Sequence, residues 1–306
     1  MSNPESQRFE AFKDDATKAR YMAAYDALLA KWPVPFEELF VPTGLGVTHV
    51  VVSGPQDAPP LVLLHAFLAT ATVWRPNVEG LSRHFRVYAV DIIGQVGKSV
   101  SNRPIKNRRT YANWMCELFD ALGIARASLV GSSYGAFLAL SQASLAPERV
   151  DRVVMINPGG VFASFILFVL RMMLFALILK LFESLHLRAK GPTLSVASVL
   201  GRNVQLSPDD TAWADLVSLL WPKGMRPNAF PPTTFSAAEL RAIRTPALLL
   251  MGDNDLLYDP RVVLKRARKR MPSLEAHMIP NAHHIAAMAR PDEVNARIIQ
   301  FLQRAS

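Results

Sequence analysis

The hydrophobic and polar positions of the chain fall into short apolar runs and longer mixed stretches. Apolar runs bounded by turn residues predict strands at 46–54, 61–67, 85–93, 127–133, 151–158, 245–255 and 274–280. The stretches between them predict helices over the first thirty residues and over 110–122, 134–145 and 291–305. Strands that alternate with helices predict an α/β fold, with a mostly parallel sheet that helices cover on both faces.

Two of the predicted helices have identifiable apolar positions. In the first thirty residues these positions are spread through a charged stretch that ends before Pro33: Phe9, Phe12, Ala19, Ala23, Leu28 and Leu29. Over 110–122 the spacing places one set on a common face, beside Trp114: Tyr111, Met115, Leu118, Phe119 and Leu122. Cys116 lies on the flank of that face, where we expect a small packed thiol.

One segment, 161–182, is apolar except at Ser164, Arg171 and Lys180. Its length is sufficient for a helix that crosses a bilayer. However, Arg171 lies near its centre, where a cation costs about 2.5–3.5 kcal/mol on insertion scales. The pattern alone therefore leaves a membrane span open.

Composition narrows the classes of protein. The chain has 306 residues, of which 50% are hydrophobic, and 34 Lys+Arg against 25 Asp+Glu give a net charge of +9. This length and apolar content exclude a disordered chain and allow a large core. A single cysteine cannot form an internal disulfide, and the first ten residues contain no apolar signal segment, so we expect a cytoplasmic protein. Because the basic residues do not form a stripe with interleaved aromatic residues, we expect no nucleic-acid partner.

The residues GSSYG at 131–135 match the pattern G-x-S-x-G. They follow a predicted strand and open a predicted helix, which is the strand–turn–helix context of a nucleophile elbow. Such a turn forces the central serine into a strained conformation with its hydroxyl exposed. Ser133 is therefore the candidate nucleophile.

A serine hydroxyl needs a base, and the base needs an acid that orients it. For this elbow the expected chain order is serine, carboxylate, histidine. Four histidines follow Ser133 along the chain: His186, His277, His283 and His284. The carboxylates at the end of the strand at 245–255 and just beyond it are Asp253, Asp255 and Asp259. Asp259 precedes Pro260 and also fits a helix start.

Five motifs in order resemble the α/β-hydrolase superfamily, and within it the bacterial serine carboxylesterases. The sequence LVLLHAF at 61–67 is similar to the strand that ends in H-G-x, and AVDIIGQVGKS at 89–99 is similar to the turn D-x-x-G-x-G-x-S. The elbow follows, then LLLMGDND at 248–255 as the acid turn. The segment NAHHIAAMARPDEVN at 281–295 is similar to the family's histidine segment. The resemblance implies an α/β-hydrolase fold.

The resemblance also implies the roles of five residues. Ser133 is the nucleophile, Asp255 the acid and His284 the base. The backbone N–H groups of Phe67 and Tyr134 form the oxyanion hole, which stabilises the charge that develops on the substrate oxygen. Their side chains, with those of Trp213 and Trp221, are expected to line an apolar or aromatic pocket.

Three positions depart from the family pattern. Ala66 replaces a glycine after His65, and His283 replaces the glycine before the catalytic histidine. The turn at 94–99 is one residue longer than usual. We expect His65 to be a structural hydrogen-bonding residue without a catalytic role.

The order of these residues along the chain excludes a membrane span at 161–182. The segment lies between Ser133 and Asp255, so a single span would separate the nucleophile from its base, which must lie within hydrogen-bond reach. We therefore expect a helical cap (lid) at 161–235, on a core formed by 36–160 and 236–306, with an N-terminal helical extension at 1–35. Cap helices near 194–200 and 213–221, a partner subunit in a homodimer, or a lipid surface could cover the apolar segment.

The resulting hypothesis is a serine hydrolase that cleaves small apolar or aromatic carboxylic esters through an acyl-enzyme. A carbon–carbon bond hydrolase, an amidase, a perhydrolase, or a non-catalytic hydrolase-like binding protein are the alternatives. Haloalkane dehalogenases and epoxide hydrolases of this fold use an aspartate as nucleophile, so Ser133 argues against both of these activities. The chain has no metal-binding, P-loop or dinucleotide motif, so we expect no cofactor and no metal.

Overall fold

The structure is a computed structural model of the chain. It describes residues 11–163, 208–220 and 228–304.

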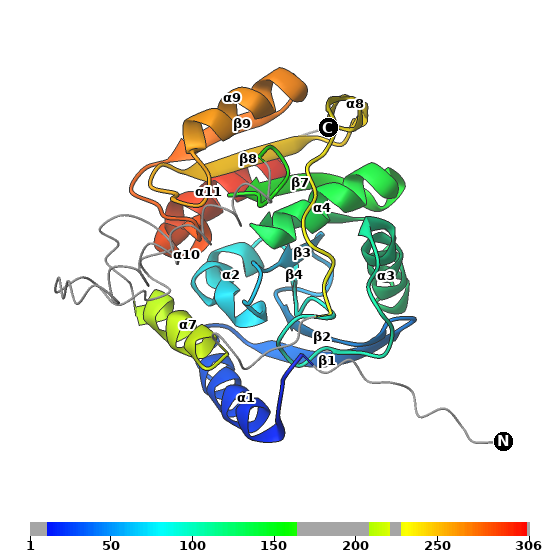
Figure 1. The fold of residues 1–306 in the computed structure, drawn as a ribbon, viewed down its shortest axis with the longest axis vertical. Helices are drawn as coiled ribbons and strands as arrows, with labels where there is room; N and C mark the ends of the chain where they lie inside the picture. The colour runs from blue at the N-terminus through cyan, green and yellow to red at the C-terminus, as the bar shows by residue number, and fades with distance from the viewer. Residues whose placement is uncertain (1–10, 164–207, 221–227, 305–306) are drawn as a thin grey trace, which may run out of the picture.

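A sheet of nine strands runs through the described residues, from β9 at the top of Figure 1 to β1 at the bottom. The strand order is β1-β2-β4-β3-β6-β7-β8-β9, with β5 paired to β2. Pairs that involve β2 are antiparallel. In the strand order above, every neighbouring pair from β4 through β3, β6, β7 and β8 to β9 is parallel. The bounds are β1 Phe36–Thr43, β2 Gly46–Ser53, β3 Pro60–Leu64, β4 Arg86–Val90, β5 Val100–Ser101, β6 Ala127–Ser132, β7 Val150–Ile156, β8 Ala247–Gly252 and β9 Glu275–Ile279. The predicted mostly parallel sheet is confirmed.

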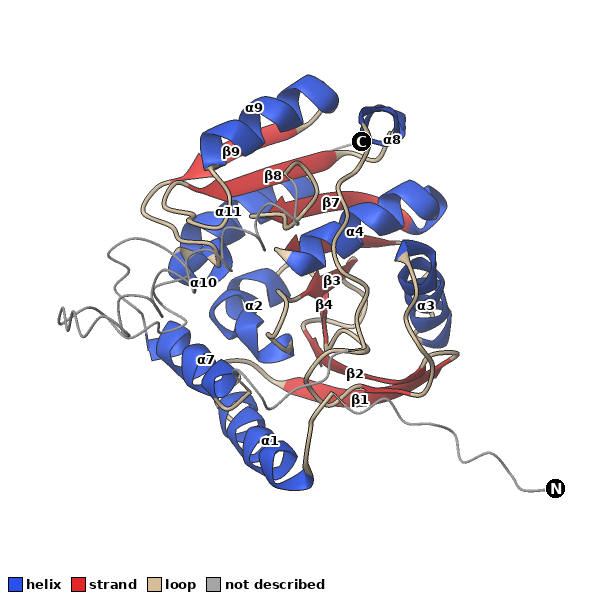
Figure 2. Cartoon of the chain, viewed as in Figure 1, coloured by secondary structure: helices blue, strands red, loops and turns tan. Residues whose placement is uncertain are grey.

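Helices cover both faces of this sheet (Figure 2). One face packs against α3 (Arg108–Ala121), α4 (Tyr134–Leu145), α8 (Ala237–Ala242) and α9 (Pro260–Arg270). The other face packs against α1 (Asp15–Leu29), η1 (Ala71–Trp74), α2 (Arg75–Ser82), α7 (Pro208–Ser218), α10 (Ala286–Ala289) and α11 (Pro291–Leu302). A short helix, η2 (Pro147–Arg149), precedes β7.

The strands are apolar at successive positions because both of their faces are buried. In β3, Val62 and Leu64 belong to the core under α3 and α4, while Leu61 and Leu63 belong to the core on the opposite face. The strand β8 alternates in the same way. A strand buried on both faces reads as a continuous apolar run, which explains why these strands were predictable.

The N-terminal helix differs from its prediction. It begins only at Asp15, because the Asp14 side chain accepts the N–H of Thr17 and caps the first turn. Tyr21, Tyr25 and Leu29 form its buried face. Ala19 and Ala23, two of the apolar positions that predicted this helix, are exposed, and Phe9 lies outside the described residues. The apolar rings of the two tyrosines form the packing surface, and an apolar/polar reading of the sequence missed them.

The elements that were not predicted include β1 and α2. β1 is an edge strand in which Phe36, Glu37, Glu38 and Phe40 are partly or largely exposed, so it lacks the buried apolar run of an inner strand. The helix α2 is only eight residues long and contains a proline in its first turn. The predicted face of α3 is confirmed at Tyr111, Met115, Leu118 and Phe119, with Trp114 also buried and Leu122 partly buried.

Most of the apolar segment 161–182 and the expected helix near 194–200 lie outside the described residues. Val161 and Phe162, at its start, are buried in the core under α4. Within the described ranges, no helix has the length and apolarity needed to cross a membrane. The helix α7 lies beside α1 and also contacts α10.

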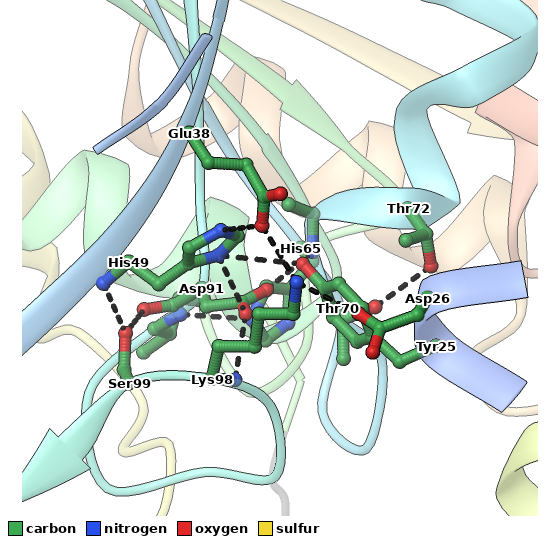
Figure 3. A network of polar contacts seen from close by, with 12 residues as sticks. Tyr25, Asp26, Glu38, His49, His65, Thr70, Thr72, Asp91, Lys98 and Ser99 are labelled. Carbon is green, nitrogen blue, oxygen red and sulfur yellow. Dashed lines mark hydrogen bonds and ion pairs between the residues drawn. The ribbon is translucent and has the colours of Figure 1, made fainter. Parts of the chain in front are cut away.

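A buried polar network joins α1, β1, β2 and the end of β4 (Figure 3). Asp91 follows β4 and accepts the N–H of Ala71 at 2.7 Å and the N–H of Lys98 at 2.9 Å. The two ring nitrogens of His49 face Asp91 Oδ2 at 3.0 Å and Glu38 Oε1 at 2.9 Å. Lys98 Nζ reaches Asp26 at 2.8 Å and Glu38 at 2.6 Å. The network thus ties the N-terminal helix to the turn that begins η1.

The contacts of His49 favour its charged form. Both ring nitrogens can donate only in the imidazolium, and both face a carboxylate. Burial disfavours the charge, but the hydrogen bonds and charges of Asp91 and Glu38 outweigh burial and raise the pKa of His49. Burial also acts against the charge of Asp91, but the His49 contact outweighs it and lowers the pKa of Asp91.

This network predicts a pH dependence of stability. A histidine whose pKa is raised on folding stabilises the fold fully below its unfolded pKa of about 6.5, and the contribution is lost as the pH rises through the folded pKa. The free energy of unfolding of the wild type should therefore fall as the pH rises above about 6.5. Urea denaturation of His49→Gln should show a flatter profile. The exposed His84 provides the control, since His84→Gln should keep the wild-type slope; equal slopes in wild type and His49→Gln would contradict the prediction.

Candidate active site

The nucleophile elbow forms at the junction of β6 and α4. Ser133 lies between them with φ 49° and ψ −105°, in the left-handed region that a residue with a side chain rarely adopts. Its N–H donates to Ile156 O at 2.8 Å, and its carbonyl accepts the N–H of Gly159 at 3.1 Å. These bonds to the end of β7 hold the strained residue, as the sequence pattern predicted.

The two glycines of the elbow are required by close packing. A Cβ at Gly135 would lie 2.0 Å from Leu64 O, and a Cβ at Gly131 would lie 2.3 Å from the backbone of Gly135. Neither glycine has a positive φ; Ser133 alone carries that conformation in the motif. Glycine therefore allows β3, β6 and α4 to approach one another behind the serine.

The loop after β8 carries Asp255 and is called the acid loop, and the loop after β9 carries His284 and is called the histidine loop. Hydrogen bonds join the two loops. Asn254 donates its N–H to Ala282 O at 3.0 Å, and Ala282 donates its N–H to Asp253 Oδ1 at 3.2 Å. A Cβ at Gly252 would lie 2.4 Å from Ala282 O, so a glycine is needed where the loops meet. This pairing fixes the loop after β8 against the loop after β9.

Ser133, Asp255 and His284 form one hydrogen-bonded chain. His284 Nε2 lies 2.8 Å from Ser133 Oγ, and His284 Nδ1 lies 2.8 Å from Asp255 Oδ2. An ionised carboxylate only accepts, so Nδ1 carries a proton and Nε2 is left to accept the serine proton. Asp255 and His284 are buried, while Ser133 is half-buried. The three residues expected from the sequence are thus brought together.

The surroundings of Asp255 keep its carboxylate charged. Its Oδ1 accepts the N–H of Leu257 at 2.8 Å and that of Tyr258 at 3.3 Å, and its Oδ2 accepts Asn157 Nδ2 at 2.8 Å. Burial would raise the pKa of this group, but His284, Asn157 and the Leu257 N–H outweigh burial and lower the pKa of Asp255 below its usual range. The carboxylate is therefore ionised when it meets the imidazole.

The rival carboxylates bind elsewhere. Asp253 accepts the backbone N–H of Ala282, and Asp259 caps α9 by accepting the N–H groups of Arg261 and Val262. The helix start expected at Asp259 is thus present.

The rival histidines are also placed away from the serine where the structure describes them. His283 is buried and its Nδ1 accepts the N–H of Ile285 at 3.1 Å. His277 faces Glu275 at 2.7 Å, and His186 lies outside the described residues.

Phe67 and Tyr134 lie on adjacent segments beside Ser133. Tyr134 begins α4 directly after Ser133, and Phe67 follows β3, with 5.8 Å between the two ring centroids. Within the described residues, neither backbone N–H donates to another protein group. Ala66 does not adopt a positive φ; Leu68 does, at 64°. Alanine in place of the family's glycine is therefore accommodated.

The aromatic side chains that were expected to line a pocket differ in their exposure. Phe67 is 41% exposed, but Tyr134 is buried and its hydroxyl donates to Phe230 O at 2.6 Å. Trp213 is also buried, in the core that α7 shares with α1. Trp221 lies outside the described residues. Trp213 packs between helices. The sequence alone does not distinguish this packing role from contact with a substrate.

His65 has the structural role that the sequence suggested. Its Nε2 accepts the N–H of Ile92 at 2.9 Å, so Nδ1 carries the proton and donates to Ala66 O at 2.7 Å. Burial lowers the pKa of His65 and keeps the ring neutral. The ring joins the end of β3 to the turn after β4. Across the described ranges, no group of three His, Cys, Asp or Glu side chains could hold a metal ion.

The fold agrees with comparisons against known proteins. The alpha/beta hydrolase family matches residues 61–297, and the chain belongs to this family. It is 35% identical over 291 residues to an uncharacterized carboxylesterase, nap, of Bacillus subtilis (strain 168), with 92% of each chain covered. It is also 35% identical over 290 residues to carboxylesterase YbfK of the same organism, with 92% of this chain and 93% of that protein covered.

Solved structures give the same result. The crystal structure of naproxen esterase (carboxylesterase NP) from Bacillus subtilis is 33% identical and has a TM-score of 0.81, with 95% of this chain and 100% of that chain covered. The expected resemblance to bacterial carboxylesterases is therefore confirmed.

One residue of the site was missed from the sequence. Asn157 contacts Asp255 but stands alone after the apolar run of β7, and it belongs to none of the motifs that identified the other residues. Its position at the carboxyl end of a strand next to β8 was the available signal, because ligands and catalytic groups gather at that edge of a parallel sheet.

Close packing at the elbow predicts a large effect of one methyl group. Gly135→Ala should lower the free energy of unfolding by about 2–3 kcal/mol or more, since its Cβ would overlap backbone atoms that cannot rotate away. Gly44→Ala is the matched control, because its Cβ would meet only the Glu117 carboxylate at the end of a side chain. Chemical denaturation of both variants should separate them clearly. Equal stability of the two variants would contradict the packing argument.

Proposed function

We propose that this protein hydrolyses carboxylic esters, with Ser133 as nucleophile, His284 as general base and Asp255 as the acid that orients it. The observation that carries the proposal is the unbroken chain of two 2.8 Å contacts from Asp255 through His284 to Ser133. Two relatives at 35% identity over most of the chain are carboxylesterases by name, which supports the same reaction class.

In the first half-reaction, Ser133 Oγ attacks the ester carbonyl carbon. His284 Nε2 takes the hydroxyl proton as the new C–O bond forms, and Asp255 stabilises the resulting imidazolium through Nδ1. The tetrahedral intermediate then expels the alcohol, which receives its proton from Nε2. The product bound to the protein is an acyl ester of Ser133.

In the second half-reaction, water replaces the serine as the attacking group. His284 Nε2 takes a proton from water, the hydroxide oxygen adds to the acyl carbon, and Ser133 leaves with the proton that the imidazolium returns. The carboxylic acid is released and the three residues regain their starting protonation.

The backbone N–H groups of Phe67 and Tyr134 are proposed to hold the oxyanion. Both residues flank Ser133 on segments that the elbow glycines bring together, and both N–H groups are available within the described part of the chain. A donor at such a position contributes about 3 kcal/mol to stabilisation of the transition state. Mutation of the side chains leaves these donors in place.

The proposed substrates are esters of small molecules with an apolar or aromatic group. Phe67 supports this choice, because a large apolar ring that is 41% exposed stands beside the proposed oxyanion site. The cap boundaries at 161–235, a contact of that segment with lipid or with a second copy, and a cytoplasmic location stay predictions.

Three variants test the reaction. Ser133→Ala should lower kcat/KM for p-nitrophenyl acetate by about 10⁴–10⁶-fold, and His284→Ala should be similar, because each removes the same concerted attack. Asp255→Asn should lose about 10⁴-fold, since the amide favours the wrong imidazole tautomer. Ser218→Ala, at an exposed serine on α7, is the control and should retain wild-type activity. Full activity of Ser133→Ala would reject the assignment.

Phe67 predicts a substrate preference. Phe67→Ala should raise KM for ethyl phenylacetate about 5–10-fold, through loss of apolar contact, and leave KM for ethyl acetate nearly unchanged. Titration of released acid would measure both esters. Phe36→Ala removes a ring of similar exposure, 38%, on the distant edge strand β1 and should change neither value. If Phe67→Ala affected the two esters equally, the proposed contact would be wrong.

A further inference from the structure

Asn157 is a fully buried amide at the end of β7. Its Nδ2 lies 2.8 Å from Asp255 Oδ2, the same oxygen that faces His284 Nδ1 at 2.8 Å. One carboxylate oxygen therefore receives two donors, the imidazole and the amide. The amide reaches the proposed acid from the neighbouring strand.

The orientation of this amide is fixed by its second contact. The Gly252 N–H lies 3.3 Å from Asn157 Oδ1, and a backbone N–H can only donate, so the atom facing it must be the amide oxygen. Nδ2, with its two protons, then faces Asp255. The Asn157 N–H also donates to Leu250 O at 2.9 Å, which continues the pairing of β7 with β8 beyond the strand end.

The backbone of Asn157 adopts a conformation that few residue types favour. Its φ is 45°, in the left-handed region where asparagine is enriched among residues other than glycine. Residues before and after Asn157 bind the elbow. The carbonyl of Ile156 accepts the Ser133 N–H, and the N–H of Gly159 donates to Ser133 O. This turn thus touches the nucleophile through its backbone and the acid through the Asn157 side chain.

We propose that Asn157 is a positioning residue for the ester hydrolysis described above, holding Asp255 Oδ2 in line with His284 Nδ1. This inference rests on the proposed function. The carboxylate is held at both ends, since Oδ1 binds the N–H groups of Leu257 and Tyr258 and Oδ2 binds Asn157. Without the amide proton, Oδ2 keeps only the imidazole, and the carboxylate can rotate about its Oδ1 contacts.

Loss of this donor also changes the charge balance of the site. A carboxylate with fewer donors is less stabilised as an anion, so it interacts more strongly with the imidazolium. The acid limb of the kcat/KM profile, which follows loss of the imidazolium proton, should then move to higher pH. The other titratable side chains on the loops that carry Asp255 and His284 are Asp253, Tyr258, Asp259 and His283. Burial raises the pKa of Tyr258, Asp253 accepts the N–H of Ala282, and Asp259 caps α9.

Two variants remove the donor in different ways. Asn157→Gly removes the whole amide and suits the positive φ of this residue, and Asn157→Leu keeps a side chain of similar length without its polar atoms. Each should lower kcat for p-nitrophenyl acetate about tenfold to a hundredfold, leave KM within about twofold, and move the acid limb to higher pH. Neither variant adds a charge beside Asp255, so the two variants should shift in the same direction.

Asn295→Leu is the matched control, because Asn295 is a buried asparagine that pairs with Asn77 away from the serine. It should lower thermal stability and leave the acid limb in place. A purely structural role of Asn157 would give that same result, with lower stability and an unmoved acid limb, and would overturn the inference.

The design separates this inference from the proposed function. If the wild type did not hydrolyse the ester, or if Ser133→Ala retained its activity, the proposed function would fail. If wild type were active and dependent on Ser133 while the Asn157 variants kept its kcat and acid limb, only the role of Asn157 would fail. If Asn157→Leu did not fold, Asn157→Gly, which suits the backbone conformation of residue 157, would decide alone.

Discussion

The contact between Asp255 and His284 is the interaction on which the rest of the site depends. A buried carboxylate is costly unless donors surround it, and here the imidazole, the Asn157 amide and two backbone N–H groups do so. This arrangement fixes the imidazole tautomer and leaves Nε2 to accept the Ser133 proton. The charged carboxylate of Asp255 therefore directs the proton of Ser133 to Nε2 of His284.

The fold brings these groups together by close approach of strand ends. The pairs β6–β7, β7–β8 and β8–β9 are parallel, so their carboxyl ends meet at one edge of the sheet. The elbow, the Asn157 turn, the acid loop and the histidine loop follow these four strands in order. Glycines at 131, 135 and 252 allow backbones to approach where a Cβ would overlap them. On the other side of β3, the network around His49 and Asp91 ties the N-terminal helix to the turn that begins η1.

Local patterns account for what the sequence could predict. Strands such as β3 and β8 read as apolar runs because both faces are buried, and Ser133, Asp255 and His284 stand in motifs with fixed neighbours. The edge strand β1 was missed because its exposed side chains form no apolar run. The tyrosine face of α1 was missed because its burial depends on tertiary packing. Asn157 was missed for the same reason: a single asparagine after a strand has no local signature, and its contact with Asp255 spans 98 residues of sequence.

Covalent labelling of the wild type with a fluorophosphonate, followed by peptide mapping with tandem mass spectrometry, tests the central claim most directly. The reagent is attacked by a serine that a neighbouring base activates, and it stays attached. One adduct is expected, on the peptide that contains Ser133, and it should be absent in Ser133→Ala and strongly reduced in His284→Ala. An adduct on another residue, or no adduct on the native protein, would contradict the account.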